Sequence, residues 1–225
     1  MNKKDYIDAV LLRMNEAKLS QREGFEFEGG DNSEVVRHIE GVYTDAWRKC
    51  AEIVPASWLQ VTDFSEHPQA RADGSGYLTI PTDWYKLYVF KMKGWQREVY
   101  RVAEENDEIG RLQFNPYTRG TCLHPVCVLG FGENQQRIIS YYSLPKGSVH
   151  EVEKALYIPL CTGIEKLNEQ AELKLDKRLE QVICYMAGGL VYRILGDTNS
   201  SQLLEREAIV LVHGFVLENE DKKKV

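Results

Sequence analysis

Hydrophobic positions recur at helical spacing near the start of the chain. One stripe runs through Tyr6, Val10 and Met14, and Asn2 precedes it as a candidate N-cap. A second stripe follows Ser33, another candidate N-cap, and stops at Pro55. The pattern predicts one helix over residues 2–17 and another over residues 33–54, joined by an acidic, glycine-rich loop at 24–33.

Helical spacing returns in the last third of the chain. Apolar residues recur every three or four positions from Leu175 to Ile194, and Gly196 is the expected stop. A final helix over 203–215 follows, with Asn199 and Gln202 as a capping arrangement. Gly188 and Gly189 interrupt the third helix; they fit close packing inside the bundle or close approach of a neighbouring subunit, and the sequence does not separate the two.

The middle of the chain, residues 58–145, alternates between apolar and polar positions and is rich in turn residues. It predicts a short strand at 77–81 and a second at 84–90. Lys93 and Gly94 are a predicted hairpin turn that leads into a return strand at 95–102. Another hairpin is predicted from strand 126–129 to strand 138–142.

This order of elements predicts an α+β fold: a helical bundle built from the N- and C-terminal helices, with a β-rich insertion between helix two and helix three. Amphipathic helices need one another to bury their apolar stripes. The expected parts are residues 1–57 (N-terminal helices), 58–148 (β-rich insertion), 149–217 (C-terminal helices) and 218–225 (a charged tail without core-forming residues).

Composition narrows the classes of protein. The chain has 225 residues, 43% of them hydrophobic, with a formal net charge of −6. That acidity is unlike a dedicated duplex-DNA binder, which carries a basic face. No apolar run approaches the roughly 18–20 residues that span a bilayer, and the charged N-terminus is unlike a signal peptide. Five scattered cysteines favour a reducing compartment over a disulfide framework.

Catalytic and cofactor motifs are scarce. The sequence has no phosphate-binding loop and no dinucleotide fingerprint, so we predict no cofactor. Cys122, His124 and Cys127 are the nearest approach to a zinc site, but their spacing is not a familiar half-site and a fourth ligand is missing. A carboxylate cluster could hold a divalent cation, although a solvated loop is the favoured interpretation. Its members are Glu104, Glu105, Asp107 and Glu108.

Aromatic residues concentrate in the first predicted hairpin. Trp84, Tyr88 and Trp95 belong to a group larger than one face of a small sheet can hide. Core packing is the favoured role for any single one of them, while the hairpin as a whole is a candidate protein interface.

Three segments together resemble the head-to-tail adaptor, or connector ring, proteins of tailed bacteriophages. They are residues 80–89 (IPTDWYKLYV) with the hairpin 93–99, residues 138–145 (IISYYSLP), and the small-residue helix 179–192 (LEQVICYMAGGLVY). The resemblance covers most of the chain from about residue 34 to 215 and rests on packing patterns. The segments 24–31, 103–125 and 146–174 depart from it.

The resemblance implies a non-enzymatic structural protein of the virion, assembled in the host cytoplasm and located at the portal vertex. Such proteins form a ring of about twelve copies below the portal protein, extend the DNA channel without sequence-specific DNA contact, and dock the next tail or ring protein. On this interpretation Trp84, Tyr88 and Trp95 contact neighbouring subunits or the tail. Lys222, Lys223 and Lys224 contact the portal.

Two alternatives from other classes stay open. One is a non-enzymatic binding or regulatory module that recruits a partner through the aromatic hairpin. The other is a metal-dependent enzyme that uses Cys122, His124, Cys127 or the acidic loop.

Overall fold

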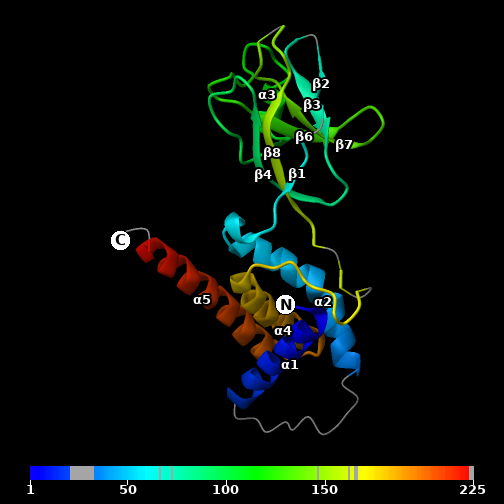
Figure 1. Ribbon diagram of the computed structural model, residues 1–225, viewed down its shortest axis with the longest axis vertical. Helices are drawn as coiled ribbons and strands as arrows, with labels where there is room; N and C mark the ends of the chain where they lie inside the picture. Colours follow the sequence, from blue (N-terminus) through cyan, green and yellow to red (C-terminus); the bar gives the residue numbers. More distant parts are fainter. Residues whose placement is uncertain are drawn as a thin grey trace. The chain divides into compact units, whose positions relative to one another are not determined.

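The computed structural model describes residues 1–20, 33–65, 67–71, 73–145, 147–161, 163–164 and 167–222, without the side chains of 16–20 and 218–222. The fold is mixed α+β, as predicted, with five α-helices and two sheets in that part of the chain (Figure 1). It divides into two compact units. The helical unit comprises residues 1–60 and 161–225, and the β unit comprises residues 61–160.

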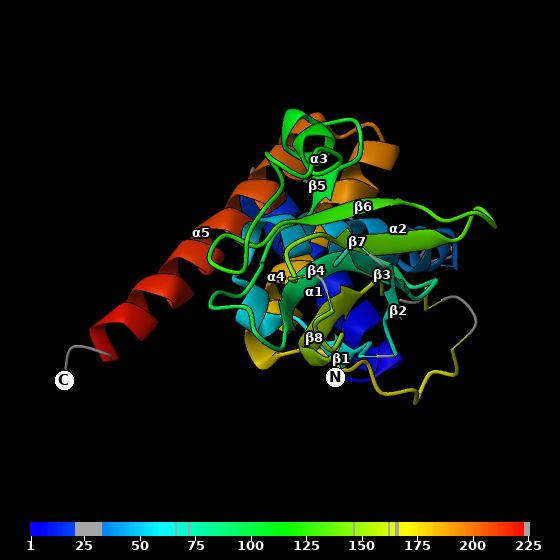
Figure 2. The same cartoon turned by 90° about the horizontal axis from the view of Figure 1, so that it is seen from above.

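The helical unit contains α1 (Lys3–Ser20), α2 (Ser33–Ile53), a 3₁₀ turn η1 (Ala56–Trp58), α4 (Lys177–Ile194) and α5 (Thr198–Lys222). All four long helices lie where the hydrophobic pattern predicts them. Helix α4 is the central element, because it packs against α1, α2 and α5 (Figures 1 and 2). Its buried face carries the predicted stripe, including Val182, Met186 and Val191.

Helix ends are fixed by local polar groups. The Asn2 side chain accepts a hydrogen bond from the Asp5 backbone N–H at 2.7 Å, which confirms the predicted cap of α1. Gly196 has a φ of +83° directly after α4 and stops it as expected. The cap of α5 differs from the prediction: the Asp197 carboxylate accepts from the Ser200 N–H at 3.0 Å. Asp197 precedes the helix and so reaches the free amides of its first turn.

The glycine pair in α4 packs inside the helical unit. A Cβ on Gly188 would lie 2.9 Å from a Leu204 methyl on α5 and 3.3 Å from Met14 on α1. A Cβ on Gly189 would lie 3.1 Å from the Ser201 carbonyl oxygen. Of the two interpretations left open by the sequence, close packing within one chain therefore accounts for both residues.

The β unit contains two sheets. The first has three antiparallel strands in the order β1 (Thr62–Asp63), β8 (Val152–Pro159), β4 (Trp84–Met92). The second sheet has five strands in the order β2 (Gln69–Ala70), β3 (Gly76–Thr79), β7 (Arg137–Tyr141), β6 (Cys127–Phe131), β5 (Ala103–Glu104). The short helix α3 (Glu108–Leu112) follows β5 in the chain. The β6–β7 pair is the second predicted hairpin, and β3 is the predicted strand at 77–81.

The first predicted hairpin is wrong in its pairing. The chain does turn at Gly94, which has a φ of +91°. The predicted return strand 95–102 makes only one bridge with β4, from Val99 to Phe90. The long antiparallel partner of β4 is instead β8, in a segment where the sequence predicted no strand. Strand pairing is decided by the shared core, which short-range alternation does not show.

Both sheets contribute to one hydrophobic core in the β unit. Phe64 packs edge-on against Trp84 at a ring-centroid distance of 5.2 Å, and Phe90 packs edge-on against Trp95 at 5.6 Å. Leu78, Ile139 and Ala155 fill the space between the rings. Such edge-to-face pairs add to the stability that burial alone gives.

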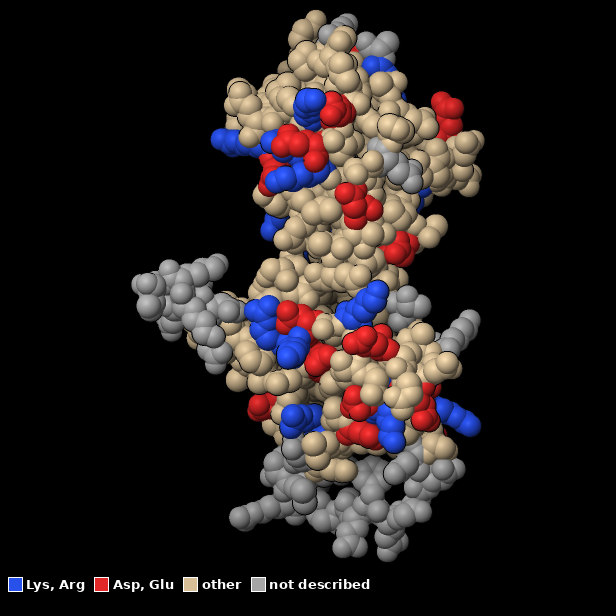
Figure 3. All heavy atoms as spheres, viewed as in Figure 1, with Lys and Arg blue, Asp and Glu red and all other residues tan. Residues whose placement is uncertain are grey.

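Charges are mixed over the surface. On the face seen in Figure 3, Lys and Arg lie close to Asp and Glu without a large area of one sign. In the β unit Lys91 pairs with Glu153, and Lys93 with Glu151, each at 2.8 Å. None of the helices in the described residues has the length and apolar character needed to cross a membrane.

Candidate functional site

The aromatic residues predicted as an interface lie mostly in the core. Trp84 is 7% exposed and stacks on the Tyr157 ring at 5.4 Å, while Trp95 is 3% exposed. The prediction that these two tryptophans contact partners is therefore corrected, because Tyr157 of β8 covers Trp84 and the rings of Phe90 and Tyr141 cover Trp95. Tyr88 on β4 is only half-buried and stays a candidate contact.

The proposed portal contacts fall at the edge of the described chain. Lys222 is the last residue of α5, so the helix continues into the segment expected to be a charged tail. Lys223 and Lys224 lie outside the described residues. Their assignment to a portal contact stays a prediction.

Cys122, His124 and Cys127 do not assemble into a metal site. Cys127 is fully buried in β6, where burial raises the pKa of its thiol. The Cys122 thiol donates to the Ser143 carbonyl oxygen at 2.9 Å, and His124 is exposed. In the part of the chain that the structure describes, no three His, Cys, Asp or Glu side chains are grouped to hold a metal ion.

The acidic cluster at 104–108 forms an exposed turn. The Asp107 carboxylate accepts a hydrogen bond from the Glu104 backbone N–H at 3.1 Å and thereby closes the turn that leads into α3. This matches the solvated loop that the sequence favoured over a cation site.

The most distinctive polar feature is a hollow of about 350 Å³ in the β unit. It lies between the turn at 73–75 and the segment at 113–119, and residues next to strands of the second sheet contribute to its lining. Its lining residues are Arg71, Asp73, Ser75, Gln113, Phe114, Arg119 and Tyr142. We call it the Arg71 hollow.

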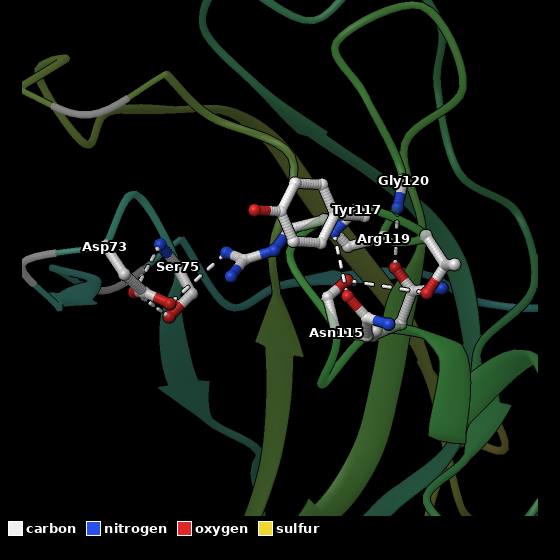
Figure 4. Close-up of polar contacts among 8 residues, drawn as sticks. Asp73, Ser75, Asn115, Tyr117, Arg119 and Gly120 are labelled. Carbon is white, nitrogen blue, oxygen red and sulfur yellow. Dashed lines mark hydrogen bonds and ion pairs between the residues drawn. The ribbon is translucent and has the colours of Figure 1, made fainter.

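One wall of the Arg71 hollow is a turn that its own hydrogen bonds hold in place. The Asp73 carboxylate accepts from the Ser75 backbone N–H at 3.0 Å and from the Ser75 hydroxyl at 2.5 Å (Figure 4). Gly74 has a φ of +85°, and a Cβ there would lie 2.3 Å from the Leu144 carbonyl oxygen. Only glycine fits this position, so the turn is packed tightly against the chain beneath it.

The opposite wall is fixed in the same way. The Gln113 side chain donates to the Ile109 carbonyl oxygen at 2.9 Å and accepts from the Gly120 N–H at 2.8 Å. The Arg119 guanidinium points across to the Asp73 carboxylate and donates to it at 3.2 Å (Figure 4). The two walls are therefore tied together by one ion pair.

Two further groups set the electrostatics of the Arg71 hollow. The hydrogen bond from Ser75, and to a lesser extent Arg119, lowers the pKa of Asp73 to about 2, so this carboxylate is ionised and offsets the charge of Arg119. Burial raises the pKa of Tyr142, and its hydroxyl therefore keeps its proton near neutral pH. The phenol is a neutral hydrogen-bond donor in the lining of the hollow.

Sequence reasoning passed over most of this site. No motif in the sequence singles out Arg119, which the structure pairs with a carboxylate. The Asp-Gly-Ser sequence at 73–75 was the available signal for an Asp-centred turn. Nothing local in the sequence links that turn to Arg119 or Tyr142.

No protein-family model matches the chain, and a search of curated proteins finds no match either.

Proposed function

We propose that the chain is a structural, non-catalytic subunit of the head-to-tail junction of a tailed bacteriophage. In this proposal about twelve copies form a ring below the portal protein, in the virion, and the next tail component docks beneath. The proposal includes the finer architecture: one helical bundle from both chain ends, with a β-rich insertion between its second and third helices. The three segments that resemble adaptor proteins are its starting point.

The observation that carries the proposal is a second apolar stripe on α5. The first stripe, Leu204, Ala208 and Val212, is buried inside the helical unit. In the second, Val210 and Leu217 lie two turns apart on one face and are 62% and 61% exposed, and Ile209, 43% exposed, lies beside that face. Exposed apolar side chains that lie together on a helix are candidates for contact with another chain, so these residues support packing against a neighbouring subunit.

Charge supports the part of the proposal that concerns DNA. A ring of subunits that each carry a formal charge of −6 repels the phosphate backbone at long range. Such a wall lets the genome pass without adhering. Tyr88, which is half-buried, and Lys222–Lys224 are kept as proposed contacts with a neighbouring subunit or tail protein and with the portal, respectively.

The proposal is tested by the native mass of the full chain, alone and mixed with the portal protein of the same genome, together with negative-stain images. We expect rings, or portal particles lengthened by a collar. Replacing Val210 and Leu217 by Glu should abolish this assembly, because it places charge in the contact. The matched control is Val149→Glu, which changes a residue that is 77% exposed in the β unit and should assemble normally.

A chain that stays at 25.9 kDa, ignores the portal and is absent from purified virions would overturn the proposal. That result would favour the regulatory-module alternative. Circular dichroism of the variant with Glu at positions 210 and 217 is the folding control. An unchanged helical signal shows that the variant is folded and that the substitutions affect assembly alone.

A further inference from the structure

Arg71 is an exposed cation that lines the Arg71 hollow. Its guanidinium lies 5.3 Å from the centre of the Tyr77 ring and contacts the Tyr142 hydroxyl. Among the described residues, no carboxylate lies within ion-pair distance of Arg71. By contrast, the second arginine of the hollow, Arg119, already has Asp73.

The charge of the hollow is therefore uneven. Arg119 and the ionised Asp73 offset each other, whereas Arg71 forms no ion pair among the described residues, although the Glu105 carboxylate acts on the nearby Tyr142 hydroxyl. The Tyr142 hydroxyl is a neutral donor beside Arg71. The Nε of Arg119 is buried and has no hydrogen-bond partner among the described residues, so a donor in the lining of the hollow is left unpaired.

The dimensions of the hollow favour a small ligand. Its volume of about 350 Å³ is that of a small-ligand site, and both walls are held by hydrogen bonds. Phe114 is 55% exposed and packs edge-on against the Tyr142 ring at 6.2 Å, which gives the opening one apolar side. A group that enters would meet the Arg71 guanidinium and the Tyr142 hydroxyl beside an aromatic surface.

We propose that the Arg71 hollow binds an oxyanion, which accepts hydrogen bonds from the Arg71 guanidinium and the Tyr142 hydroxyl. Guanidinium groups match the planar fork of a carboxylate and the face of a phosphate, and charge-assisted bonds to them are strong. The oxyanion can come from an acidic side chain or from a free phosphate. This site is independent of the ring proposal, because all its residues belong to the β unit of one chain.

The test follows the chemical modification of individual arginines by phenylglyoxal, with peptide mass spectrometry on the full chain. Modification is compared in chloride, in inorganic phosphate and in N-acetylglutamate at equal ionic strength. We expect modification of Arg71 to slow at least about fivefold and saturably, because a bound oxyanion occupies the guanidinium. Arg97, an exposed arginine of the same unit outside the hollow, is the internal control and should not be protected.

Two anions distinguish the sources. Protection by N-acetylglutamate alone assigns the site to acidic side chains, protection by phosphate alone assigns it to phosphate, and protection by both shows an unselective oxyanion site. Tyr142→Phe should weaken protection in each case while the chain stays folded. The proposal is overturned if neither anion protects Arg71, or if Arg97 is protected to the same extent. The readout is residue-specific, so failure of the ring proposal leaves it unaffected.

Discussion

In the helical unit, α4 is packed closely against α1 and α5 because glycines stand where side chains would collide. In the β unit, large aromatic rings fill the space between two sheets. The helical unit is therefore sensitive to added volume, and the β unit is sensitive to lost volume. The same chain shows both ways to reach a close-packed interior.

The largest effect is expected from removing a central ring of the β unit. Phe90 is fully buried and contacts the rings of Phe64, Trp95 and Tyr141. Phe90→Ala should lower the free energy of unfolding of the β unit by about 3–5 kcal/mol, since it leaves a cavity. Hydrogen–deuterium exchange of β4 and β8 peptides, with urea unfolding, measures this.

Phe131→Ala is the matched control for that change, because Phe131 is 69% exposed in the same unit. It should change stability by less than about 0.5 kcal/mol. Equal destabilisation by the two variants would contradict the idea that the β unit depends on its ring core.

A smaller effect is expected from adding volume to the helical unit. Gly188→Val places methyl groups where even a Cβ lies 2.9 Å from Leu204. We expect a loss of about 1–3 kcal/mol, because overpacking displaces α4 from α5. Exchange in α4 and α5 peptides should rise while β-unit peptides keep their protection.

Gly214→Val tests whether the loss of stability in Gly188→Val comes from close packing at that position, and not from replacing a helical glycine as such. Nothing lies within 4 Å of a Cβ at this helical position. Valine has a higher helix propensity than glycine, so this variant should keep or slightly raise stability. If Gly188→Val were as harmless as Gly214→Val, the contrast between the two units would fail.

The smallest effect is expected on the pH dependence of β-unit stability, through Asp73 in the turn that lines the Arg71 hollow. The pKa of Asp73 is held at about 2 in the folded chain, below its ordinary value of 3.8. A lowered folded pKa stabilises the fold above the unfolded pKa, and this contribution is lost as pH falls from about 4 to 2. The carboxylate is 47% exposed, so solvent screening limits its contribution to less than about 1 kcal/mol.

Asp73→Asn should therefore reduce β-unit stability near neutral pH and match the wild type near pH 2. Urea unfolding at a series of pH values measures the difference. Asp45→Asn changes an exposed carboxylate paired with Arg48 in the helical unit and should leave the β-unit profile unchanged. A constant difference between Asp73→Asn and wild type from pH 5 to pH 2 would contradict the role assigned to Asp73.

The sequence by itself determined the four long helices and several of their ends. Helical spacing is local, so the stripes along α2 and α4, the Asn2 cap and the Gly196 stop are all visible within a few residues. The mixed α+β class and the β6–β7 hairpin are also visible, since a hairpin joins neighbours in the chain.

Only the tertiary structure decided which segments meet over long distances. Trp84 is buried where β4 pairs with β8, and Trp95 is buried against the rings of Phe90 and Tyr141, which corrects the interface predicted for both. Gly188 likewise packs against Leu204, which belongs to the next helix. The hollow is lined by Arg71 and Asp73 together with Arg119, which lies 46 residues further along the chain than Asp73. Such contacts depend on the whole arrangement of core and sheets, and no local period in a single sequence records them.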